Sequence, residues 1–458
     1  MVVNPSNSRL PQPPSLIKAI GPSVVLLGLG LGSGELILWP YLVSNFGLGI
    51  IWAAVVGITF QFFINTEIER YSLLHGESIF AGFAKQSKKL PIWFIFSTFI
   101  AWMWPGIIAV SAKVICNVFL IKNYNLVAIG LLIIIGLVLT LGPRVYKTVE
   151  SFQKIIILLS VPAIAIITFL VAKNVDYIAL SRGLAGIGDG YFLIPKGIPL
   201  FTLLGAIAYA GAGGNLNLAQ SFYIKEKGYG MCRGVKGISS VLAGKAQNVQ
   251  IYGNQANFGD RENYTIFKKW WKLINLEHFL VFLVTGTIII LMMALLAYSS
   301  VNGSVQQQGI GFLITEAKII SQSVLPFIGT SFLIVVAVVL FATQLNILDS
   351  TSRIISENAV ILKSKLNLSK TYFLILWFQI LAGIIIFLVG YSDPVGLVVT
   401  GAVINAFAMF IHVALTYFLN KKTLPKEYQP SLLRVGIIFV SWLMFGTLAV
   451  WAIVDAIK

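Results

Sequence analysis

The sequence is poor in charged residues for its length. Of its 458 residues, 11% are Asp, Glu, Lys or Arg, whereas 57% are hydrophobic. Soluble globular domains carry about 25% charged and about 45–50% apolar residues. This composition excludes a soluble globular protein, and we predict an all-α integral membrane protein.

Cysteine and histidine are also scarce, with two and three residues respectively. Cys116 and Cys232 give no disulfide framework and no zinc-ligand spacing. His278 and His412 lie far apart in the chain, so we expect them to be hydrogen-bonded structural residues rather than metal ligands. The clusters of His, Cys and acidic residues that an enzyme active site needs are missing, so we expect neither an enzyme nor a bound cofactor.

Apolar runs near the ~20 residues needed to cross a bilayer are abundant. We expect eleven spans, at 18–45, 48–74, 91–118, 124–142, 153–173, 198–223, 273–298, 325–348, 371–390, 395–419 and 433–455. The polar, proline-rich residues 1–17 are expected to form a disordered cytoplasmic tail. The apolar run after them is too long for a signal peptide and lacks a small-residue cleavage site, so we interpret it as an uncleaved first span.

The net charge is +16. In a soluble protein this charge would indicate nucleic-acid binding, but in membrane proteins basic residues hold loops on the cytoplasmic side. With a cytoplasmic N-terminus, 26 of the 33 Lys and Arg residues fall in cytoplasmic segments. We therefore predict a cytoplasmic N-terminus and an external C-terminus in a prokaryotic plasma membrane, with the lipid bilayer and no nucleic acid as partner.

Two cytoplasmic segments stand out. One is the polar loop 225–272, which ends in FKKWWKL, Phe267 to Leu273; its indoles and lysines are typical of a membrane interface. The other is Ser350 to Ser369, whose helical pattern of apolar and charged residues predicts a helix along the membrane surface. Neither segment has the length or apolar content of a separate domain.

Glycine runs with polar residues interrupt two of the expected spans. They are LGLGLGSGELILWP, Leu27 to Pro40, and AYAGAGGNLNLAQS, Ala208 to Ser221. Such runs weaken a helix in a solvent that cannot hydrogen-bond the freed backbone, so they are tolerated only where they line a protein cavity. A pair of them in matching halves of the chain indicates a transport site.

The breaks fall in the first and the sixth span. We expect two inverted five-span repeats, 18–173 and 198–420, followed by an additional span at 433–455. Because an odd number of spans turns the second repeat upside down, the two breaks should face each other near the bilayer midplane. No clear residue-level identity links the halves, so this prediction rests on spacing and on the glycine breaks.

Three segments resemble the Nramp divalent-metal transporters. They are Gly21 to Pro40, which opens with Gly-Pro, the second break in LLGAIAYAGAGGNLNLAQSFYIKEK, Leu203 to Lys227, and the Asn-Ala helix with its Asn-basic-Leu-Pro loop, Gly401 to Pro425. The resemblance covers most of the chain and is weakest in the long cytoplasmic loop. It implies the leucine-transporter-type fold, which agrees with the count of spans.

The departures from the family fall on its metal ligands. The first-span signature Asp-Pro-Gly-Asn is here Gly32, Ser33, Gly34 and Glu35, and the sixth-span Met-Pro-His-Asn is here Ala212, Gly213, Gly214 and Asn215. A thioether selects soft transition metals, and hard cations prefer oxygen. Loss of the Met and of the proton-carrying acids resembles the Nramp-related magnesium transporters, so the resemblance implies a harder cation than manganese or iron; the missing first-span Asp departs from those transporters as well, and the carry-over is partial.

The family's proton route is missing too. It uses the first-span Asp, the sixth-span His and carboxylates of the third span, yet this chain has no acidic residue between Glu77 and Glu150. The third span carries Lys113 instead. Coupling to protons, to sodium or to neither therefore stays open.

Glu35 is the sharpest candidate for a ligand. A charged side chain in the middle of a span costs roughly 2.5 kcal/mol or more and needs a reason. Binding a cation or carrying a proton is one reason. The alternatives are pairing with a basic or amide group across the bundle, or capping the second half-helix.

The amides after the second break complete the predicted site. Their oxygens suit a hard cation and their N–H groups suit a carboxylate, although such amides also join helices in membranes. The predicted substrate-binding residues are Glu35, Gly32, Ser33, Gly34, Tyr209, Ala212, Gly213, Gly214, Asn215, Asn217, Gln220 and Gln344, with Glu35 and Asn215 as metal ligands.

Five charged residues are weaker candidates for an ion path or gate: Glu67, Glu69, Arg70, Lys113 and Asp349. Glu67 with Arg70 and Asp349 with Arg353 have helical spacings that favour self-neutralising pairs. Lys113 is expected either to snorkel to the outer interface or to balance Glu35 or an anionic substrate.

We therefore predict a secondary transporter that moves a divalent cation, magnesium in preference to manganese or iron, by alternating access. The alternative is a transporter of the same fold for a small organic solute or a metal–organic acid complex. In its favour, glycine-rich breaks expose backbone N–H groups that hold carboxylates, and small side chains leave more room than an ion needs. The sequence is compatible with a monomer.

Overall fold

The computed structural model describes residues 9–142, 144–239, 249–301, 310–390 and 393–457. Most residues in these ranges are helical, and the only β-type pairings there are isolated bridges between Arg144 and Ser239 and between Ile187 and Phe192. An all-helical architecture follows from the solvent, because a helix satisfies its backbone hydrogen bonds within itself.

Ten helical segments of the described chain are long and apolar enough to cross a membrane. They are Pro22–Phe46, Leu48–His75, Leu90–Phe119, Tyr124–Leu141, Val145–Val171, Arg261–Val301, Pro326–Leu362, Leu368–Leu388, Pro394–Thr423 and Leu432–Trp451. Each corresponds to one of the runs expected from the sequence, and the remaining run, 198–223, is the discontinuous one. The chain is a multi-pass membrane protein.

The sixth span is interrupted as its glycines predict. Helix α11, Leu200–Ala208, ends at the break, a 3-10 turn follows at Gly214–Ala219, and α12 runs over Gln220–Lys227. The unwound residues 209–213 separate the two half-helices.

The first span differs from a simple interruption. Helix α2, Pro22–Gly30, passes into a π-helix at Leu31–Leu38 and then into α3, Trp39–Phe46, so the backbone stays helical throughout. The glycines widen the winding here instead of unwinding it, and π-helical turns of this kind occur mostly at functional sites. The seventh span has the same arrangement. It consists of α13, Arg261–His278, a π-helix at Phe279–Val284 and α14, Thr285–Val301.

The other spans contain longer regular helices, apart from the third. That span is divided into α6, Leu90–Trp102, and α7, Gly106–Phe119, because Pro105 cannot continue the ladder. The remaining spans are α4, Trp52–His75; α8, Tyr124–Leu141; α9, Val145–Val171; α16, Pro326–Leu362; α17, Leu368–Leu388; α18, Pro394–Thr423; and α19, Leu432–Ile457.

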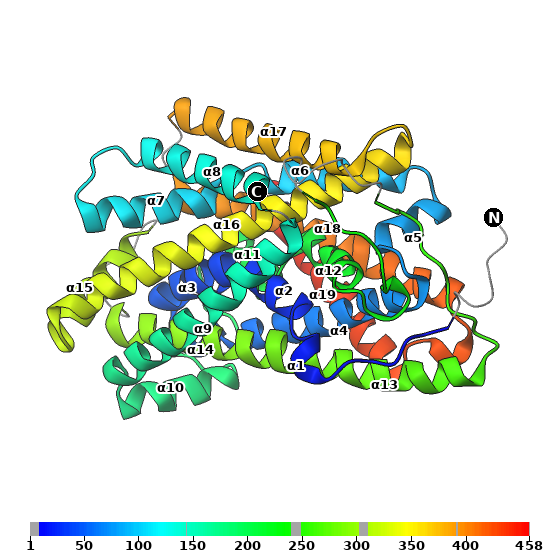
Figure 1. Cartoon of the computed structure of the whole chain (residues 1–458). Coiled ribbons are helices and arrows are strands. Elements are labelled where there is room, and N and C mark those ends of the chain that lie inside the picture. Colours follow the sequence, from blue (N-terminus) through cyan, green and yellow to red (C-terminus); the bar gives the residue numbers. More distant parts are fainter. Residues whose placement is uncertain (1–8, 143, 240–248, 302–309, 391–392, 458) are drawn as a thin grey trace.

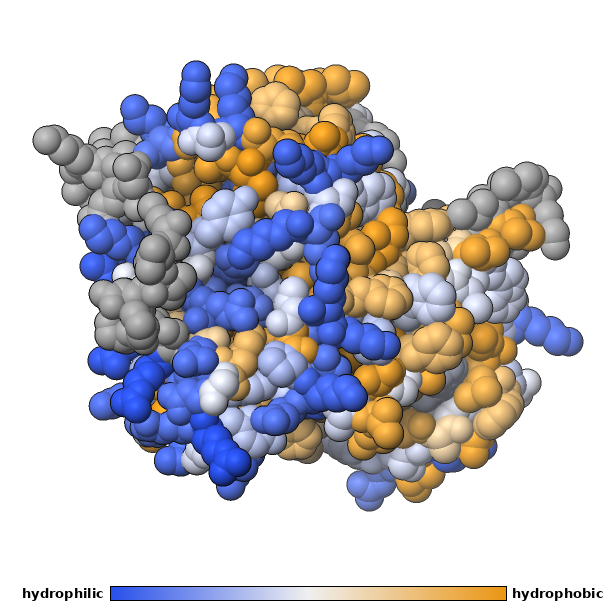
Figure 2. All heavy atoms as spheres, turned by 90° about the vertical axis from the view of Figure 1, so that its right-hand side faces the viewer, coloured by the Kyte–Doolittle hydropathy of each residue, from blue (hydrophilic) through white to orange (hydrophobic). Residues whose placement is uncertain are grey.

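Short helices lie at the two ends of the bundle (Figure 1). At one end, called the loop end here, lie residues 228–239 and 249–260 and α5, Ile79–Gln86; at the opposite end lie α10, Asn174–Leu184, and α15, Gly311–Ser323. The short helix α1, Leu16–Ala19, packs beside α13. Figure 2 looks onto the loop end and shows hydrophilic side chains gathered over much of it, with apolar side chains along its margins. Tilted spans run between these ends and enclose the break.

The first described residues are docked, which differs from the expected disordered tail. Leu10 is 3% exposed and its N–H donates to Oδ1 of Asn263 at 2.8 Å. The indole of Trp270 donates to the carbonyl of Pro11 at 2.6 Å. These bonds to α13 order the segment from residue 9 onward, and residues 1–8 lie outside the described residues.

Two expected surface segments are buried instead. Residues Ser350 to Leu362 continue the eighth span as the last part of α16, and most of their side chains are buried in the bundle. In FKKWWKL, Phe267 and Trp270 are 3% and 2% exposed, so this face of α13 packs on the protein and not on lipid. In both cases residues whose sequence pattern is typical of a membrane interface pack against other parts of the protein.

Candidate functional site

Three glycines give the break its shape. Gly211, Gly213 and Gly214 have φ angles of 123°, 74° and 56°, a region that side-chain-bearing residues rarely adopt. Helix α11 therefore ends before them, and the helical hydrogen-bond ladder is interrupted over residues 209–213. At this depth the freed backbone groups need other partners.

Gln61 of α4 supplies three of those partners. Its Nε2 donates to the carbonyls of Ala208 and Ala210, both at 2.9 Å, and its Oε1 accepts from the N–H of Gly213 at 3.1 Å. Gln61 was not expected from the sequence, since a single amide in an apolar span gives no sign of a partner about 150 residues away. The only available signal was that a buried amide needs a partner.

Two residues of α18 support the other side of the break. His412 Nε2 lies 2.9 Å from the carbonyl oxygen of Gly214, and Asn405 Nδ2 donates to the Tyr209 hydroxyl at 2.9 Å. His412 is thus a hydrogen-bonded structural residue, as expected. His278 likewise has a hydrogen-bonding partner, Ser23, at 2.7 Å.

The first span packs directly on this break. A Cβ atom at Gly34 would overlap the carbonyl oxygen of Tyr209, and one at Gly30 would lie 2.6 Å from the carbonyl oxygen of Gly211. The two glycines let the π-helix approach the unwound backbone more closely than any other residue would. The two predicted breaks are therefore in contact with each other.

Glu35 lies where the first span packs on the break. Its side chain is fully buried, and Oε1 is 2.7 Å from the position that a Cβ of Gly30 would take, beside the Gly211 carbonyl. Neither carboxylate oxygen has a hydrogen-bond partner among the described residues. A buried, unsatisfied carboxylate is costly unless a cation or a proton joins it.

Gly32 and Ser33 take part in packing. A Cβ at Gly32 would meet Thr343 of α16 at 2.6 Å, and the hydroxyl of Ser33 donates to the carbonyl of Gly30 at 3.4 Å. Gly32 thus allows the first span to approach the eighth. Ala212 is fully buried in the break.

The amides after the break have different surroundings. Asn215 Nδ2 donates to the hydroxyls of Ser97 and Thr98 at 2.8 and 2.9 Å, which leaves its Oδ1 without a partner in the described chain. Both polar side-chain atoms of Asn217 are buried and lack such a partner. Gln220 donates to Oε1 of Glu69 at 2.5 Å, so it belongs to a different polar group.

Tyr209 and Gln344 border a narrow aromatic cavity. The Tyr209 ring stacks on Trp102 at 5.2 Å between centroids and 13° between planes, and Trp104 and Gln344 complete the polar part of the lining. The cavity has room for about one water molecule. A bound solute larger than this would require the aromatic side chains to move.

The described chain contains no group of three or more His, Cys, Asp or Glu side chains placed to hold a metal ion. Any ion at the break would therefore be held by Glu35 together with amide and backbone oxygens. Oxygen donors of this kind suit hard cations.

Comparison with solved structures identifies the architecture. Structures of the Eremococcus coleocola manganese transporter match 97–98% of this chain and 89–90% of theirs, with TM-scores of 0.71–0.72 at 14% identity. Mhp1, a nucleobase-cation-symport-1 family transporter in a closed conformation with bromovinylhydantoin bound, matches 99% of this chain and 96% of its own, with a TM-score of 0.59 at 10% identity. The fold is that of the leucine transporter.

A third match within this fold is MhsT in complex with L-phenylalanine, which has a TM-score of 0.54 at 14% identity over 95% of this chain and 98% of its own. No family model and no curated protein sequence matches the chain. The leucine-transporter fold consists of two inverted five-span repeats, and here an eleventh span, α19, follows them. The glycine runs lie in its first and sixth spans: the sixth is interrupted, and the first passes through the π-helix at Leu31–Leu38.

Three of the predicted gate residues belong to ion pairs. Arg70 donates to Glu67 at 2.7 and 3.0 Å, and Glu67 also pairs with Arg434 of α19 at 3.2 Å. Asp349 accepts from Arg353 at 2.9 Å. Both self-neutralising pairs predicted from helical spacing are present.

Lys113 lies away from Glu35 and the break. Its Nζ is 4.7 Å from the centre of the Tyr124 ring, and it lines an open cavity together with Tyr124, Lys122 and Asp393. Since that cavity opens at the surface, the snorkelling interpretation fits this position.

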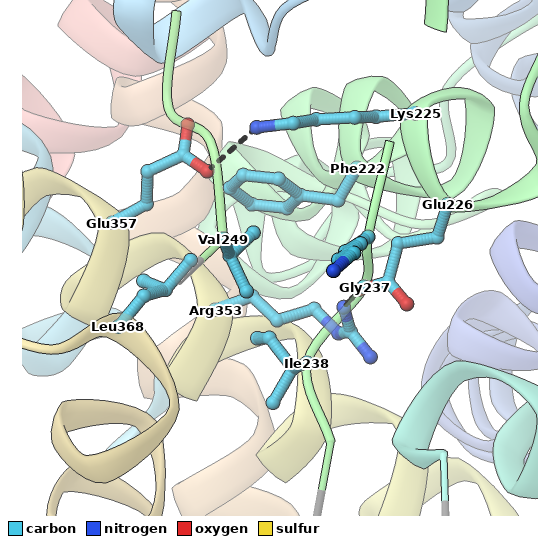
Figure 3. A pocket seen from close by; sticks show the side chains of 10 residues that line it. Phe222, Lys225, Glu226, Gly237, Ile238, Val249, Arg353, Glu357 and Leu368 are labelled. Carbon is cyan, nitrogen blue, oxygen red and sulfur yellow. Dashed lines mark hydrogen bonds and ion pairs between the residues drawn. The ribbon is translucent and has the colours of Figure 1, made fainter. Parts of the chain in front are cut away.

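The second half of the broken helix is fastened to α16 at the loop end. Glu226 of α12 forms an ion pair with Arg353, and Lys225 pairs with Glu357 at 3.6 Å. Figure 3 shows Lys225 reaching toward Glu357 beside a narrow pocket bordered by Phe222, Ile238 and Leu368. These two pairs join α12 to α16 at the loop end.

Proposed function

We propose that the chain is a secondary transporter that moves a small solute by alternating access, with Glu35 as the group that meets a cation. The observation that carries the proposal is the fully buried Glu35 carboxylate, unpaired within the described chain, at the contact between the two broken spans. Since every residue from Gly32 to Glu35 and from Tyr209 to Asn215 is buried, the site is closed toward both ends.

Transport requires this closed site to open at one end at a time. At the loop end the ion pairs of Arg353 with Glu226 and of Lys225 with Glu357 would separate as α12 moves from α16. The π-helix of the first span and the glycines of the sixth supply backbone that changes conformation at low cost. Rocking one group of spans against the other then exposes Glu35 alternately to each side.

For the substrate we propose a hard divalent cation, with magnesium preferred to manganese or iron. Glu35 and the free Oδ1 of Asn215 are the side-chain oxygens proposed as its ligands. Residues 209–215 contain no Met, Cys or His in place of the missing family Met, and the His412 imidazole beside them bonds the Gly214 carbonyl, which disfavours soft metals. This proposal places the chain near the Nramp-related magnesium transporters, and the manganese transporter is among its structural neighbours.

A small organic solute or a metal–organic acid complex is the second candidate. The stacked Tyr209 and Trp102 rings and the Gln344 amide border a narrow cavity, which would hold such a solute if the rings moved apart. Planar rings and an amide are typical of sites for organic ligands. The three small residues Ala212, Gly213 and Gly214 would allow such a solute to approach the break.

We further propose that the loop end faces the cytoplasm of a prokaryotic cell, which places the C-terminus outside. The support is the count of basic residues, 26 of 33 in the segments assigned to that side. The repeats are proposed to comprise residues 18–173 and 198–420, and a monomer provides all parts of the site.

The test is thermal stabilisation of the full-length protein in detergent by a panel of divalent cations, small carboxylic acids, amines and metal chelates. A ligand at ~100 times its dissociation constant adds roughly 2.7 kcal/mol to the folded state. We expect magnesium to raise the melting temperature of the wild type but not of Glu35→Gln. A shift with an organic compound alone would favour the second candidate.

Glu316→Gln is the matched control. Glu316 of α15 is also fully buried, with neither oxygen partnered in the described chain, but its helix lies at the end of the bundle. It should keep the magnesium shift. If Glu35→Gln retained both ligand stabilisation and uptake into proteoliposomes, the proposed role of Glu35 would be wrong.

A further inference from the structure

A second group of buried titratable side chains lies between the break and the loop end. Glu69 comes from α4, and Glu277 and His278 end α13. Each is at most 1% exposed. From the sequence, Glu69 is a weak gate candidate and His278 is expected to be a structural residue, whereas Glu277 was not singled out.

Contacts connect these residues into one network. His278 Nδ1 lies 3.5 Å from Oε1 of Glu69 and 2.7 Å from the hydroxyl of Ser23. The same hydroxyl donates to Oε2 of Glu277, and the N–H of Gly21 donates to its Oε1 at 3.3 Å. The network therefore joins the beginning of the first span to the second and the seventh.

The network reaches the break in two ways. Gln220, the first residue of α12, donates to Oε1 of Glu69 at 2.5 Å. On α4, Gln61, Asn65 and Glu69 are spaced by four residues and share one face, of which Gln61 holds the break. Asn65 between them is fully buried, with both polar atoms unpartnered in the described chain.

The network also comes close to the surface at the loop end. A Cβ at Gly21 would lie 2.8 Å from Nζ of Lys227, which pairs with Glu150 at 2.6 Å. Glu150 pairs in turn with Lys154 at 2.6 Å, and the side chain of Lys154 is 41% exposed. Polar groups therefore continue from solvent to the break.

The charges around the network leave its two carboxylates uncompensated at short range. Within the described residues no Lys or Arg forms an ion pair with Glu69 or Glu277. Arg434 of α19 acts on Glu69 and His278 from a longer distance, Lys227 acts on Glu277, and Tyr146 and Tyr229 interact electrostatically with Glu277. Two carboxyl groups in one buried network can share a proton, and an imidazole can relay it.

We propose that Glu69, His278 and Glu277 form a proton-binding site whose occupancy controls how α12 is held against α4. The contacts of this network alone support the binding of a proton. The coupling of that proton to transport rests on the function proposed above. The proton resides on the two carboxyl groups and passes between them through His278 and Ser23.

Protonation changes the bond that connects the network to the broken helix. An ionised Glu69 accepts a strong hydrogen bond from Nε2 of Gln220. A protonated Glu69 offers a hydroxyl donor instead, for which Oε1 of Gln220, unpartnered in the described chain, is the acceptor at hand. The switch would reorient Gln220 at the start of α12, the half-helix whose ion pairs close the loop end.

Infrared difference spectra of the full-length protein in nanodiscs, recorded as the pH changes, test proton binding. Glu69→Gln and Glu277→Gln should each change the same carboxylic-acid band, and the double variant should change it less than the sum of the single variants. Glu316→Gln should leave that band in place. Additive, independent changes would mean that the two residues share no proton.

Ser23→Ala guards against failure of the charge variants to fold. It removes the bridge between His278 and Glu277 without altering any charge, so we expect the shared band to divide into two independent ones. An unchanged band in Ser23→Ala would overturn the relay.

Uptake into proteoliposomes tests coupling. We expect a pH gradient to stimulate uptake by the wild type and Glu316→Gln, whereas Glu69→Gln and Glu277→Gln lose this stimulation but keep exchange of substrate across the membrane. Equal stimulation of all four proteins, or none in the wild type, would contradict the coupling. Absence of uptake by the wild type for every solute would instead contradict the proposed function, and the infrared result would still decide on proton binding.

Discussion

The backbone of Gly34 in the first span lies directly against the carbonyl oxygen of Tyr209 in the sixth, with no space for a Cβ atom between them. This contact brings the first and the sixth span together. Glu35 is the next residue after Gly34 in the first span. The close approach depends on glycine, because any side chain would push backbone against backbone.

Gly34→Ala should therefore destabilise the protein strongly. Overpacking typically costs about 1–3 kcal/mol, and we expect the upper end, since the clash is with main chain that cannot rotate away. The melting temperature in detergent measures the effect. Gly130→Ala in α8 is the control: nothing lies within 4 Å of its Cβ position, so this variant should be at least as stable as the wild type.

Gln61→Leu should destabilise more than Gln153→Leu, although both glutamines are buried in spans. Gln61 bonds three backbone groups of the break, while Gln153 donates to the carbonyl of Ala342 alone. Each buried polar group left unpaired costs about 1–3 kcal/mol. Equal losses of melting temperature for the two variants would show that the break does not depend on Gln61.

Glu67→Gln should cost about 3–5 kcal/mol, because it leaves Arg70 and Arg434 facing each other without their shared carboxylate. The Arg70 and Arg434 guanidinium groups also lie over the Trp271 ring, at 3.7 and 4.6 Å, so the loss should perturb α13 as well. Tryptophan fluorescence during chemical unfolding reports both effects.

Arg9→Ala removes a comparison pair at the surface. The Arg9 and Glu262 side chains are 68% and 54% exposed, and exposed pairs contribute about 0–1 kcal/mol. If Glu67→Gln lowered the free energy of unfolding as little as Arg9→Ala, the ion pairs of Glu67 with Arg70 and Arg434 would not stabilise the protein.

Cys232 should react slowly with maleimide at neutral pH. Its thiol is fully buried and donates to the carbonyl of Ser72 at 3.3 Å, and burial raises the pKa of the Cys232 thiol to about 12. The pKa of an unfolded cysteine is about 8.5. The stabilisation from the neutral thiol is therefore complete below about pH 8.5 and is lost as the pH rises toward 12.

Labelling kinetics in a Cys116→Ser background isolate this thiol. We expect slow labelling at pH 7.5 that becomes fast only in denaturant. Rapid labelling of the folded protein would show that the loop end opens around Cys232 under native conditions.

The positions of the spans and of the break in the sixth could be predicted from sequence, because the bilayer imposes a length on each apolar run and glycine has few tolerable uses at its centre. Glu35 was recognised for the same reason. The π-helix at Leu31–Leu38 could not be foreseen, since the sequence carries no signal that separates wider winding from unwinding.

The partners of the buried polar residues also could not be predicted from the sequence. Ser350 to Ser369 was expected at the membrane surface because of its helical pattern of apolar and charged residues, yet Arg353 and Glu357 meet Glu226 and Lys225 of a distant helix. Gln61 and Glu277 gave no pattern at all. Pairing with distant helices decides whether a polar residue in a span is exposed or buried. The spacing of residues along one helix does not reveal that pairing.

Helix α16 is 37 residues long, about 55 Å, whereas the hydrocarbon core of a bilayer is about 30 Å thick. A continuous rod of this length acts as a lever, since it contacts the first span at Gly32 through Thr343 and carries the Arg353 and Glu357 ion pairs near its far end. A small tilt beside the break becomes a larger displacement at Leu362. A spectroscopic label placed there would read events at the centre of the membrane from its edge.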